Sequence, residues 1–469
     1  MKKIPCFTLF SLLVYTSALA TIRLPAVISS NMVLQQRSTA ALWGWGDPGE
    51  KLFVTASWGT ATDSLTVPSD GRWKIQLPTP AAGGPYTIIL QGWNRIVLDN
   101  ILLGEVWLCS GQSNMEWSSY NNNRQIMDEL PKSANSQIRL FHIARTTADY
   151  PQDNCEGRWE VCGPETLKGF SAVGYFFGKK LQRELNVPIG LIEAAWGGTP
   201  VESWTPAPII ANDPVLQTAA AQLPATVWGP HLPGLLYNAM IAPVTSFAIA
   251  GAIWYQGESN TGTAASYQAT FTAMIEGWRN SFEKNFPFYY VQIAPYNYGN
   301  HNQGALLQEQ QTRTQSLPGT GMVVVTDLVD NVNDIHPQNK YDVGERLAGW
   351  ALGDTYGRPV AAYKNPALKS AAPEKNTIVL SFDHAPNGLV TREGKPATEF
   401  YIAGSDQVFL PADTRIEANR IIVSHKKIAN PVAVRFGFSN TARPNLFSKE
   451  GLPVTPFRTD KWDTVLTTP

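Results

Sequence analysis

The chain has 469 residues, of which 16% are charged, and its formal net charge at pH 7 is -1. A chain of this length exceeds the size at which one hydrophobic core keeps growing, so about two or three domains are expected. No basic block is present that could neutralise a row of phosphates or dock on an anionic membrane, which argues against nucleic acid and membrane surfaces as partners.

Residues 1–20 are typical of a cleavable signal peptide. Lys2 and Lys3 give a positive start, residues 7–15 form an apolar run, and 18–20 offer small residues for cleavage. The apolar run is too short to span a bilayer, and no later segment approaches ~20 uninterrupted apolar residues. We therefore expect a secreted or periplasmic protein without membrane insertion, with an uncleaved anchor as the alternative.

Loss of this segment leaves an odd number of cysteines, namely Cys109, Cys155 and Cys162. An oxidising compartment favours disulfides, and Cys155 and Cys162 flank a short loop that contains glycine. Cys162 could equally be a small buried hydrophobic residue. Spacing does not show the Cβ geometry that a disulfide needs, so a Cys155–Cys162 bridge stays open.

Residues 21–101 predict an N-terminal β-sandwich domain. Short alternating segments are interrupted by Gly, Pro and Asp, and in residues 51–58 the side chains of Leu52, Val54 and Ala56 share one face of a pleat. Alternation of this kind is typical of half-buried strands in small all-β domains.

Residues 102–357 predict an α/β domain, because buried apolar strands alternate there with longer helical segments. Such alternation indicates a parallel sheet with helices on its faces, which binds ligands at the carboxyl ends of the strands. The predicted strands include 106–108, 189–195, 249–255, 288–293 and 322–326, and the predicted helices include 173–185, 267–278 and 339–350.

Residues 358–469 predict a C-terminal β-rich, sandwich-like domain, because the short-strand pattern returns there. No linker rich in Ser and Gly separates the predicted domains, so we expect them to pack together.

A serine follows the first strand of the α/β domain directly, within Gly111–Met115. A helix N-terminus at such a strand end can stabilise an oxyanion, and a serine needs a base to become a nucleophile. His336 lies in a loop after the last strand, and Asp334 precedes it by two residues. The pattern predicts Ser113 as nucleophile, His336 as base and Asp334 as the acid that orients the ring.

Four motifs occur in order along the α/β domain, namely 111–115 (GQSNM), 196–204 (WGGTPVESW), 254–260 (WYQGESN) and 334–337 (DIHP). Together they resemble the sialate O-acetylesterase family, a branch of the SGNH/GDSL hydrolases. Two further strings near the predicted mature start and near the end, 31–35 and 449–453, resemble the same family, so the likeness covers nearly the whole mature chain.

The resemblance implies an SGNH-type, flavodoxin-like parallel sheet with helices on both faces, flanked by the two β domains. It also implies hydrolysis of O-acetyl esters of sugars, with Ser113 as nucleophile and its backbone N–H as an oxyanion donor. Gly197 or Gly198 would supply another N–H, and Gln256 stands where the wider superfamily has an asparagine donor. A main-chain carbonyl or another carboxylate could replace Asp334, which leaves a Ser-His dyad open.

An acetyl group is small, so the pocket beside Ser113 should be narrow. Trp117, Trp196 and Trp254 are candidate walls, and Glu258 is a candidate substrate-binding residue. The expected partner is an acetylated sugar or glycan. No cofactor is expected, and no second His or Cys stands at metal-ligand spacing from His336. The oligomeric state is not specified by the sequence.

Other interpretations remain. Ser113 could merely cap a helix, Gly197 and Gly198 could form a tight turn, and Ser259 is a rival nucleophile. The substrate could be acetylated xylan or another polysaccharide. A carbohydrate-binding protein with an inactive hydrolase domain is the alternative from another functional class.

Overall fold

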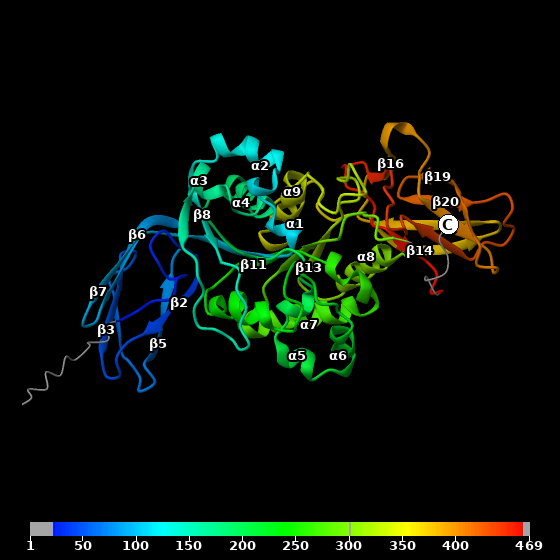
Figure 1. The fold of residues 1–469 in the computed structure, drawn as a ribbon. Coiled ribbons are helices and arrows are strands. Elements are labelled where there is room, and N and C mark those ends of the chain that lie inside the picture. Colours follow the sequence, from blue (N-terminus) through cyan, green and yellow to red (C-terminus); the bar gives the residue numbers. More distant parts are fainter. Residues whose placement is uncertain (1–21, 300–301, 463–469) are drawn as a thin grey trace, which may run out of the picture.

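A sheet covered by helices occupies the middle of the chain in the computed structural model, which describes residues 22–299 and 302–462. The predicted signal peptide, residues 1–20, lies outside the described residues. Within the described part of the chain, no helix is both long enough and apolar enough to cross a membrane. Figure 1 shows β-rich regions at the two ends of the molecule, with the helices between them.

The central sheet is parallel except at one edge. Its strands are β7 (Arg95–Gly111), β8 (Asn135–His142), β9 (Trp159–Cys162), β10 (Ile189–Ala195), β11 (Gly251–Tyr255), β12 (Phe288–Val291) and β13 (Thr320–Val323). They lie in the order β13-β12-β11-β7-β10-β8-β9, and only β9 pairs antiparallel with its neighbour. The part β10-β7-β11-β12-β13 has the 2-1-3-4-5 order of flavodoxin-like sheets, while β8 and β9 extend it beyond the prediction.

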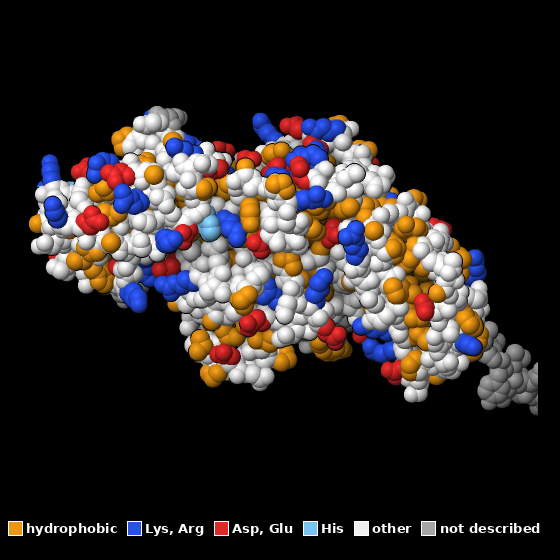
Figure 2. Space-filling model, turned by 180° about the vertical axis from the view of Figure 1, so that it is seen from behind, with side chains coloured by type: hydrophobic (Ala, Val, Ile, Leu, Met, Phe, Trp, Pro, Cys, Tyr) orange, Lys and Arg blue, Asp and Glu red, His pale blue; other side chains and the backbone are white. Residues whose placement is uncertain are grey.

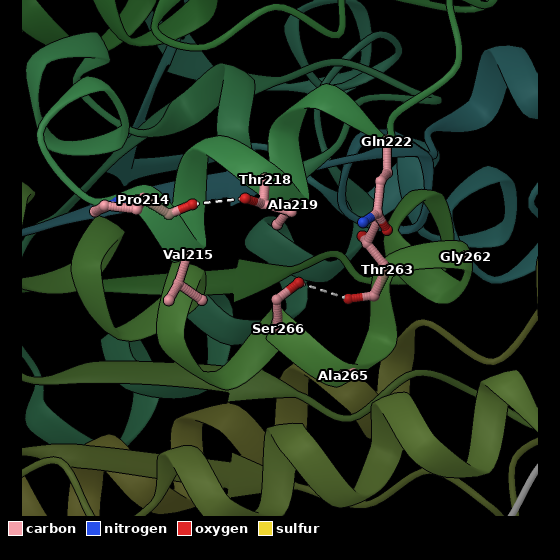
Figure 3. Close-up of a pocket in the computed structure, with 9 residues that line it drawn as sticks. All are labelled: Pro214, Val215, Thr218, Ala219, Gln222, Gly262, Thr263, Ala265 and Ser266. Atoms are coloured by element: carbon pink, nitrogen blue, oxygen red, sulfur yellow. Dashed lines mark hydrogen bonds between the residues drawn. The ribbon is translucent and has the colours of Figure 1, made fainter.

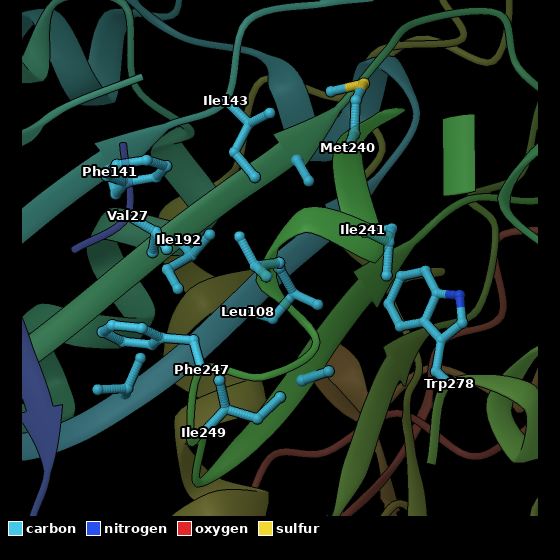
Figure 4. Packing of buried hydrophobic residues seen from close by; sticks show 14 of the residues in the cluster. Val27, Leu108, Phe141, Ile143, Ile192, Met240, Ile241, Phe247, Ile249 and Trp278 are labelled. Carbon is cyan, nitrogen blue, oxygen red and sulfur yellow. The ribbon is translucent and has the colours of Figure 1, made fainter. Parts of the chain in front are cut away.

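Helices cover both faces of this sheet, as predicted. Along β7, Trp107 packs in one hydrophobic cluster with α4 and α9, and its neighbour Leu108 packs in another with α7 and α8. Leu108 and Trp278 of α7 belong to the same cluster in Figure 4. Successive side chains of a strand point to opposite faces of the sheet. Because helices cover both faces, these strands are apolar throughout. The helices are α1 (Ser113–Glu116), α2 (Arg124–Glu129), α3 (Pro164–Leu167), α4 (Ala172–Leu185), α5 (Ala207–Ala211), α6 (Pro214–Ala221), α7 (Tyr267–Ser281), α8 (Gln303–Thr314) and α9 (Tyr341–Trp350).

The N-terminal β region shares a strand with the central sheet. The first part of β7 pairs with β6, and its last part pairs with β10 and β11. The domain boundary predicted between residues 101 and 102 therefore falls inside one continuous strand, which couples the two regions without a linker. The other strands of this region are β1 (Val33–Gln35), β2 (Ser38–Trp45), β3 (Lys51–Ala56), β4 (Thr62–Thr66), β5 (Arg72–Thr79) and β6 (Gly83–Gln91).

The C-terminal β region has a hydrophobic core of its own. Side chains from the sheets β14-β15-β20-β19 and β18-β17-β21-β23 meet in it. Its strands are β14 (Ala367–Glu374), β15 (Thr377–Asp383), β16 (Leu389–Thr391), β17 (Phe400–Ala403), β18 (Phe409–Pro411), β19 (Asp413–Glu417), β20 (Arg420–Ser424), β21 (Ala433–Phe436), β22 (Leu446–Ser448) and β23 (Phe457–Arg458).

This C-terminal region also holds the loop that follows β13. Arg443 donates hydrogen bonds to the carbonyl oxygens of Val329 and Asp330, at 3.2 and 3.1 Å. Arg458 pairs with Glu309 of α8 at 2.9 Å. The Arg443 contacts restrict the backbone between β13 and His336, a segment without regular structure, and the Arg458 pair joins the C-terminal region to α8.

The structure has no disulfide between Cys155 and Cys162. Cys155 and Cys162 are both buried and free, as is Cys109. Cys162 donates a weak hydrogen bond to the Ser133 carbonyl oxygen at 3.3 Å, so it behaves as a small buried side chain.

Charged groups are distributed evenly over the visible surface. Lys and Arg side chains are interspersed with Asp and Glu side chains on the face in Figure 2. This distribution matches the nearly balanced charge of the sequence.

Candidate active site

The turn that carries Ser113 is fixed by the strands on either side of β7. Gln112 N–H donates to the Tyr255 carbonyl at the end of β11, and Trp196 N–H donates to the Gly111 carbonyl. Gly111 has a φ of +139°, and a Cβ there would lie 2.2 Å from the Tyr255 carbonyl oxygen, so only glycine fits. Ser113 then begins α1 at the carboxyl end of the sheet.

The structure brings Ser113 and His336 together. The Oγ of Ser113 and the Nε2 of His336 lie 2.9 Å apart, although 223 positions separate them in the chain. Such a distance allows the imidazole to take the hydroxyl proton directly. Trp117 stacks on His336 with ring centroids 4.6 Å apart and an interplanar angle of 21°, which fixes the plane of the imidazole.

Asp334 is near His336 but makes no hydrogen bond with its ring. The Asp334 Oδ1 to His336 Nδ1 distance is 3.8 Å, beyond hydrogen-bond range. Instead, Asp334 Oδ1 accepts the backbone N–H of His336 at 2.9 Å. This contact positions the backbone of the histidine, so the role of Asp334 as triad acid stays a prediction.

The Asp334→Asn variant tests that role. Asparagine can keep the acceptor for the His336 N–H while it removes the carboxylate charge, so we expect kcat/KM to fall by less than about tenfold, against the ~10⁴-fold loss found when a hydrogen-bonded triad acid is changed in this way. The measurement is acetyl ester hydrolysis at neutral pH, with Asp330→Asn on the same loop as control. A loss of several thousandfold in Asp334→Asn alone would show that the carboxylate orients the ring during turnover.

The environment of the His336 imidazole favours its neutral form. Burial is the main cause that lowers the pKa of the imidazole to about 4, Lys340 lowers it further, and Asp334 opposes them. A base must be unprotonated to accept the serine proton, so the imidazole has the required form over a wide pH range.

The glycine pair lies beside Ser113, but one of its N–H groups is occupied. A Cβ on Gly197 would lie 3.2 Å from the Cβ of Ser113. The Gly197 N–H donates to Glu116 Oε2 at 2.9 Å, and Glu116 also pairs with Arg145. Gly197 is therefore not a free oxyanion donor here, because a carboxylate already holds its hydrogen. Gly198 has a φ of +75°, which favours glycine.

The predicted third oxyanion donor, Gln256, is wrong. Its side chain is fully buried, and its amide donates to the Thr199 carbonyl at 3.2 Å and to Asn260 Oδ1 at 2.7 Å. Its oxygen accepts the Tyr267 hydroxyl at 2.8 Å. Both amide hydrogens are therefore bonded, one to Thr199 and one to Asn260 of the 3-10 helix η6 (Glu258–Ser266), so neither is available to an oxyanion.

The predicted walls divide into two groups. Trp117 contacts His336, and Trp196 is half-buried beneath Arg145, whose guanidinium lies 5.8 Å from the ring centroid. Trp254 is wrong as a wall, because its side chain is fully buried between Trp204 and α7. The indole fills the core on the α7 side of β11 and has no access to a substrate.

Glu258, predicted to bind substrate, belongs to a buried polar network, and its direct contact with substrate stays a prediction. Its Oε1 accepts the Asn114 amide at 2.6 Å, and Asn114 Oδ1 accepts the Lys340 ammonium at 2.6 Å. The same Asn114 amide donates to the Ile335 carbonyl at 3.0 Å, next to His336. The network therefore ties the residue after the serine to the residue before the histidine.

Burial changes the ionisation of this network. Burial lowers the pKa of Lys340 to about 7, although Glu258 and Asp334 act in the opposite direction. Burial likewise raises the pKa of Glu258, with Asn114 and Lys340 opposing it. Lys340 also lies over the Trp117 ring at 5.2 Å from its centroid.

Sequence reasoning assigned no role at the site to Asn114, Lys340, Glu116 or Arg145. Asn114 stands within the serine motif and could have been singled out there. A single lysine such as Lys340 gives no comparable signal, because most lysines are solvated.

A separate groove lies away from Ser113 and His336. It has a volume of about 590 Å³ and lies between α6 and η6 (Figure 3). Hydrogen bonds to main-chain oxygens hold two of its lining hydroxyls, those of Thr218 and Ser266. None of its lining residues is charged or contains an imidazole, so it offers no acid or base. The lining residues are Pro214, Val215, Thr218, Ala219, Gln222, Gly262, Thr263, Ala265 and Ser266.

Comparison with known proteins agrees with this geometry. The family described as "Carbohydrate esterase, sialic acid-specific acetylesterase" matches residues 103–352. A sialate O-acetylesterase from Homo sapiens is 31% identical over 394 residues, covering 75% of this chain and 74% of that protein. A sialate O-acetylesterase from Rattus norvegicus is 28% identical over 469 aligned residues, covering 86% of each.

A solved structure extends the likeness to the whole fold. A carbohydrate acetylesterase from Xanthomonas citri superimposes with a TM-score of 0.87 at 36% identity, covering 94% of this chain and 100% of that one. Ser113 follows the carboxyl end of β7, and His336 lies in the loop after β13. Both residues lie within the matched segment, where their side chains contact each other. This chain is therefore an esterase and belongs to the sialic acid-specific acetylesterase family of carbohydrate esterases.

Proposed function

We propose that this enzyme is secreted and removes O-acetyl groups from sugars by a two-step acyl transfer. The observation that carries the proposal is the 2.9 Å contact between Ser113 Oγ and His336 Nε2, with an imidazole whose pKa is lowered. The two β-rich regions, which we take as sandwich-like domains, would flank the cleft that receives the glycan.

In the first step, Ser113 Oγ attacks the acetyl carbonyl carbon and His336 Nε2 takes the hydroxyl proton. The oxyanion that forms is stabilised by the backbone N–H of Ser113 and of Gly198, and by that of Gly197 once Glu116 withdraws. The bond between the acetyl carbon and the sugar oxygen then breaks, and His336 returns the proton to the departing hydroxyl.

In the second step, His336 takes a proton from water, which attacks the acetyl-Ser113 ester. The tetrahedral intermediate collapses, acetate leaves, and the proton on His336 returns to the serine oxygen. The residues Ser113 and His336 suffice for this chemistry, whether or not Asp334 assists.

The substrate that the relatives favour is O-acetylated sialic acid, since the human and rat proteins carry that activity in their names. The Xanthomonas citri protein is more similar in sequence and is described only as a carbohydrate acetylesterase. That description names no particular sugar, and acetylated xylan or another acetylated polysaccharide is the second candidate.

Release of acetate from O-acetylated sialic acid and from acetylated xylan, measured side by side, decides between them. We expect faster release from the sialic acid. If only xylan is cleaved, acetylated xylan replaces O-acetylated sialic acid as the substrate. If neither of the two nor any other acetylated sugar is cleaved, the proposed function is contradicted. Diethyl p-nitrophenyl phosphate should phosphorylate Ser113 with loss of p-nitrophenolate, and peptide mass spectrometry would locate the adduct.

A further inference from the structure

The loop at residues 227–232 exposes large apolar side chains. Trp228 is 75% exposed, and its neighbour Val227 and the nearby Leu232 are exposed as well. Tryptophan is mostly buried in folded proteins, and an exposed apolar cluster on a protein surface commonly marks a binding site. The position of this loop decides what it could bind.

Trp228 lies directly beside the glycines of the candidate oxyanion site. A Cβ on Gly198 would lie 2.4 Å from the Cβ of Trp228, so the backbone of Gly198 packs against the base of the indole. Gly197 in turn packs against Ser113. The indole is thus attached at the edge of the site, next to the backbone beside the nucleophile.

The loop is anchored, although its aromatic ring is exposed. The Pro230 carbonyl accepts the Ser203 hydroxyl at 2.9 Å. Gly229 packs closely on the Gly197 carbonyl and approaches the Trp196 ring nitrogen. An anchored backbone holds the base of this side chain at a fixed position beside the site, which leaves less ordering to be done when a ligand binds.

Polar groups stand next to this aromatic surface. Trp196 and Arg145 are in contact, and Glu116 joins Arg145 to the Gly197 N–H. A pyranose ring presents an apolar face of C–H groups and a periphery of hydroxyls. An aromatic face beside a half-exposed guanidinium, which can donate to hydroxyls, is complementary to both parts of a sugar.

We propose that Trp228 is a sugar-binding residue, on which a pyranose ring of the acetylated glycan stacks while its acetyl group lies at Ser113. This inference rests on the proposed function and adds the residue that selects for the glycan part of the substrate. Trp228 does not take part in proton transfer, so it should act on glycan recognition more than on the chemical step.

The Trp228→Ala variant is a clean test, because alanine keeps the Cβ that packs on Gly198 and removes only the exposed ring. We expect kcat/KM on the acetylated sugar that the wild type cleaves best to fall roughly tenfold more than kcat/KM on p-nitrophenyl acetate, a loss typical of an anchoring tryptophan. The Trp228→Phe variant should recover part of the loss. Trp93 is also largely exposed but lies in the N-terminal β region, so Trp93→Ala is the matched control and should leave both activities unchanged.

Direct binding supplies a second readout. In the Ser113→Ala background, an acetylated glycan should quench indole fluorescence, and the quenching should weaken when Trp228→Ala is added but persist when Trp93→Ala is added. Equal kinetic losses on both substrates, or unchanged glycan cleavage by Trp228→Ala, would overturn the sugar-binding role while leaving the esterase proposal intact. A wild type that cleaves p-nitrophenyl acetate but no acetylated sugar would overturn the proposed function and the role of Trp228 together.

Discussion

Replacing Ser113 by alanine should lower kcat for acetyl ester hydrolysis by at least about 10⁴-fold, because no other group replaces the oxygen that forms the covalent intermediate. The Oγ of Ser113 contacts His336 and its backbone begins α1, so the substitution removes the nucleophile without disturbing the turn. Thermal unfolding should stay close to that of the wild type. The measurement is kcat on p-nitrophenyl acetate and on an acetylated sugar.

Ser259 provides the matched control for this prediction. It is the rival nucleophile suggested by the sequence, and its backbone N–H approaches the Gln112 side-chain oxygen at 3.3 Å. Ser259→Ala should therefore retain activity, since its hydroxyl has no role in the proposed chemistry. Retention of more than a few per cent of the wild-type rate in Ser113→Ala, or loss of the rate in Ser259→Ala, would refute Ser113 as the nucleophile.

Much of the sheet could be predicted because buried parallel strands are nearly continuous apolar runs. The strand β10 has the bounds predicted for it, 189–195. The strand β8 escaped prediction because Arg139 interrupts its apolar run, and a sequence pattern does not distinguish a buried guanidinium from a solvated one. In the structure Arg139 is only 2% exposed.

The pairing of Ser113 with His336 could also be predicted, because both follow strands whose carboxyl ends meet at the same edge of the sheet. The side-chain directions of the residues around this pair could not be predicted. Resemblance to a family motif marks Trp254 and Gln256 as positions of interest, but the alternation of side chains along β11 turns Trp254 into the core. Gln256 lies just beyond the strand, and neighbours brought in by η6 and α7 use up its hydrogen-bonding groups.

Burial is the main cause that lowers the pKa of His336, and the charges of Lys340 and Asp334 also act on this pKa, so both residues should affect the pH below which activity is lost. A positive charge near an imidazole disfavours its protonation, and Lys340 is one of the causes that lower the pKa of His336 to about 4. Asp334 acts in the opposite direction. The two residues should therefore shift the acid limb of the pH profile of kcat/KM in opposite senses.

In Lys340→Met, the pKa of His336 should rise, so the acid limb moves to higher pH. If the pKa rose from about 4 to the ordinary 6.5, the neutral fraction of the imidazole at pH 5 would fall by about 30-fold, which is the upper limit for this effect because burial still lowers the pKa. At pH 8, above the pKa of about 7 for Lys340, the wild-type side chain is mostly neutral, so any loss there reports the missing hydrogen bond to Asn114.

Two further variants separate charge from position. Asp334→Asn should move the acid limb to lower pH, because removal of a negative charge makes protonation of His336 less favourable.

The double variant Lys340→Met with Glu258→Gln removes both titrating groups of the network, so no uncompensated buried carboxylate remains. If the acid limb of Lys340→Met stays where it is in the wild type while the rate at pH 8 falls, Lys340 acts by holding Asn114 and the His336 loop and not through its charge.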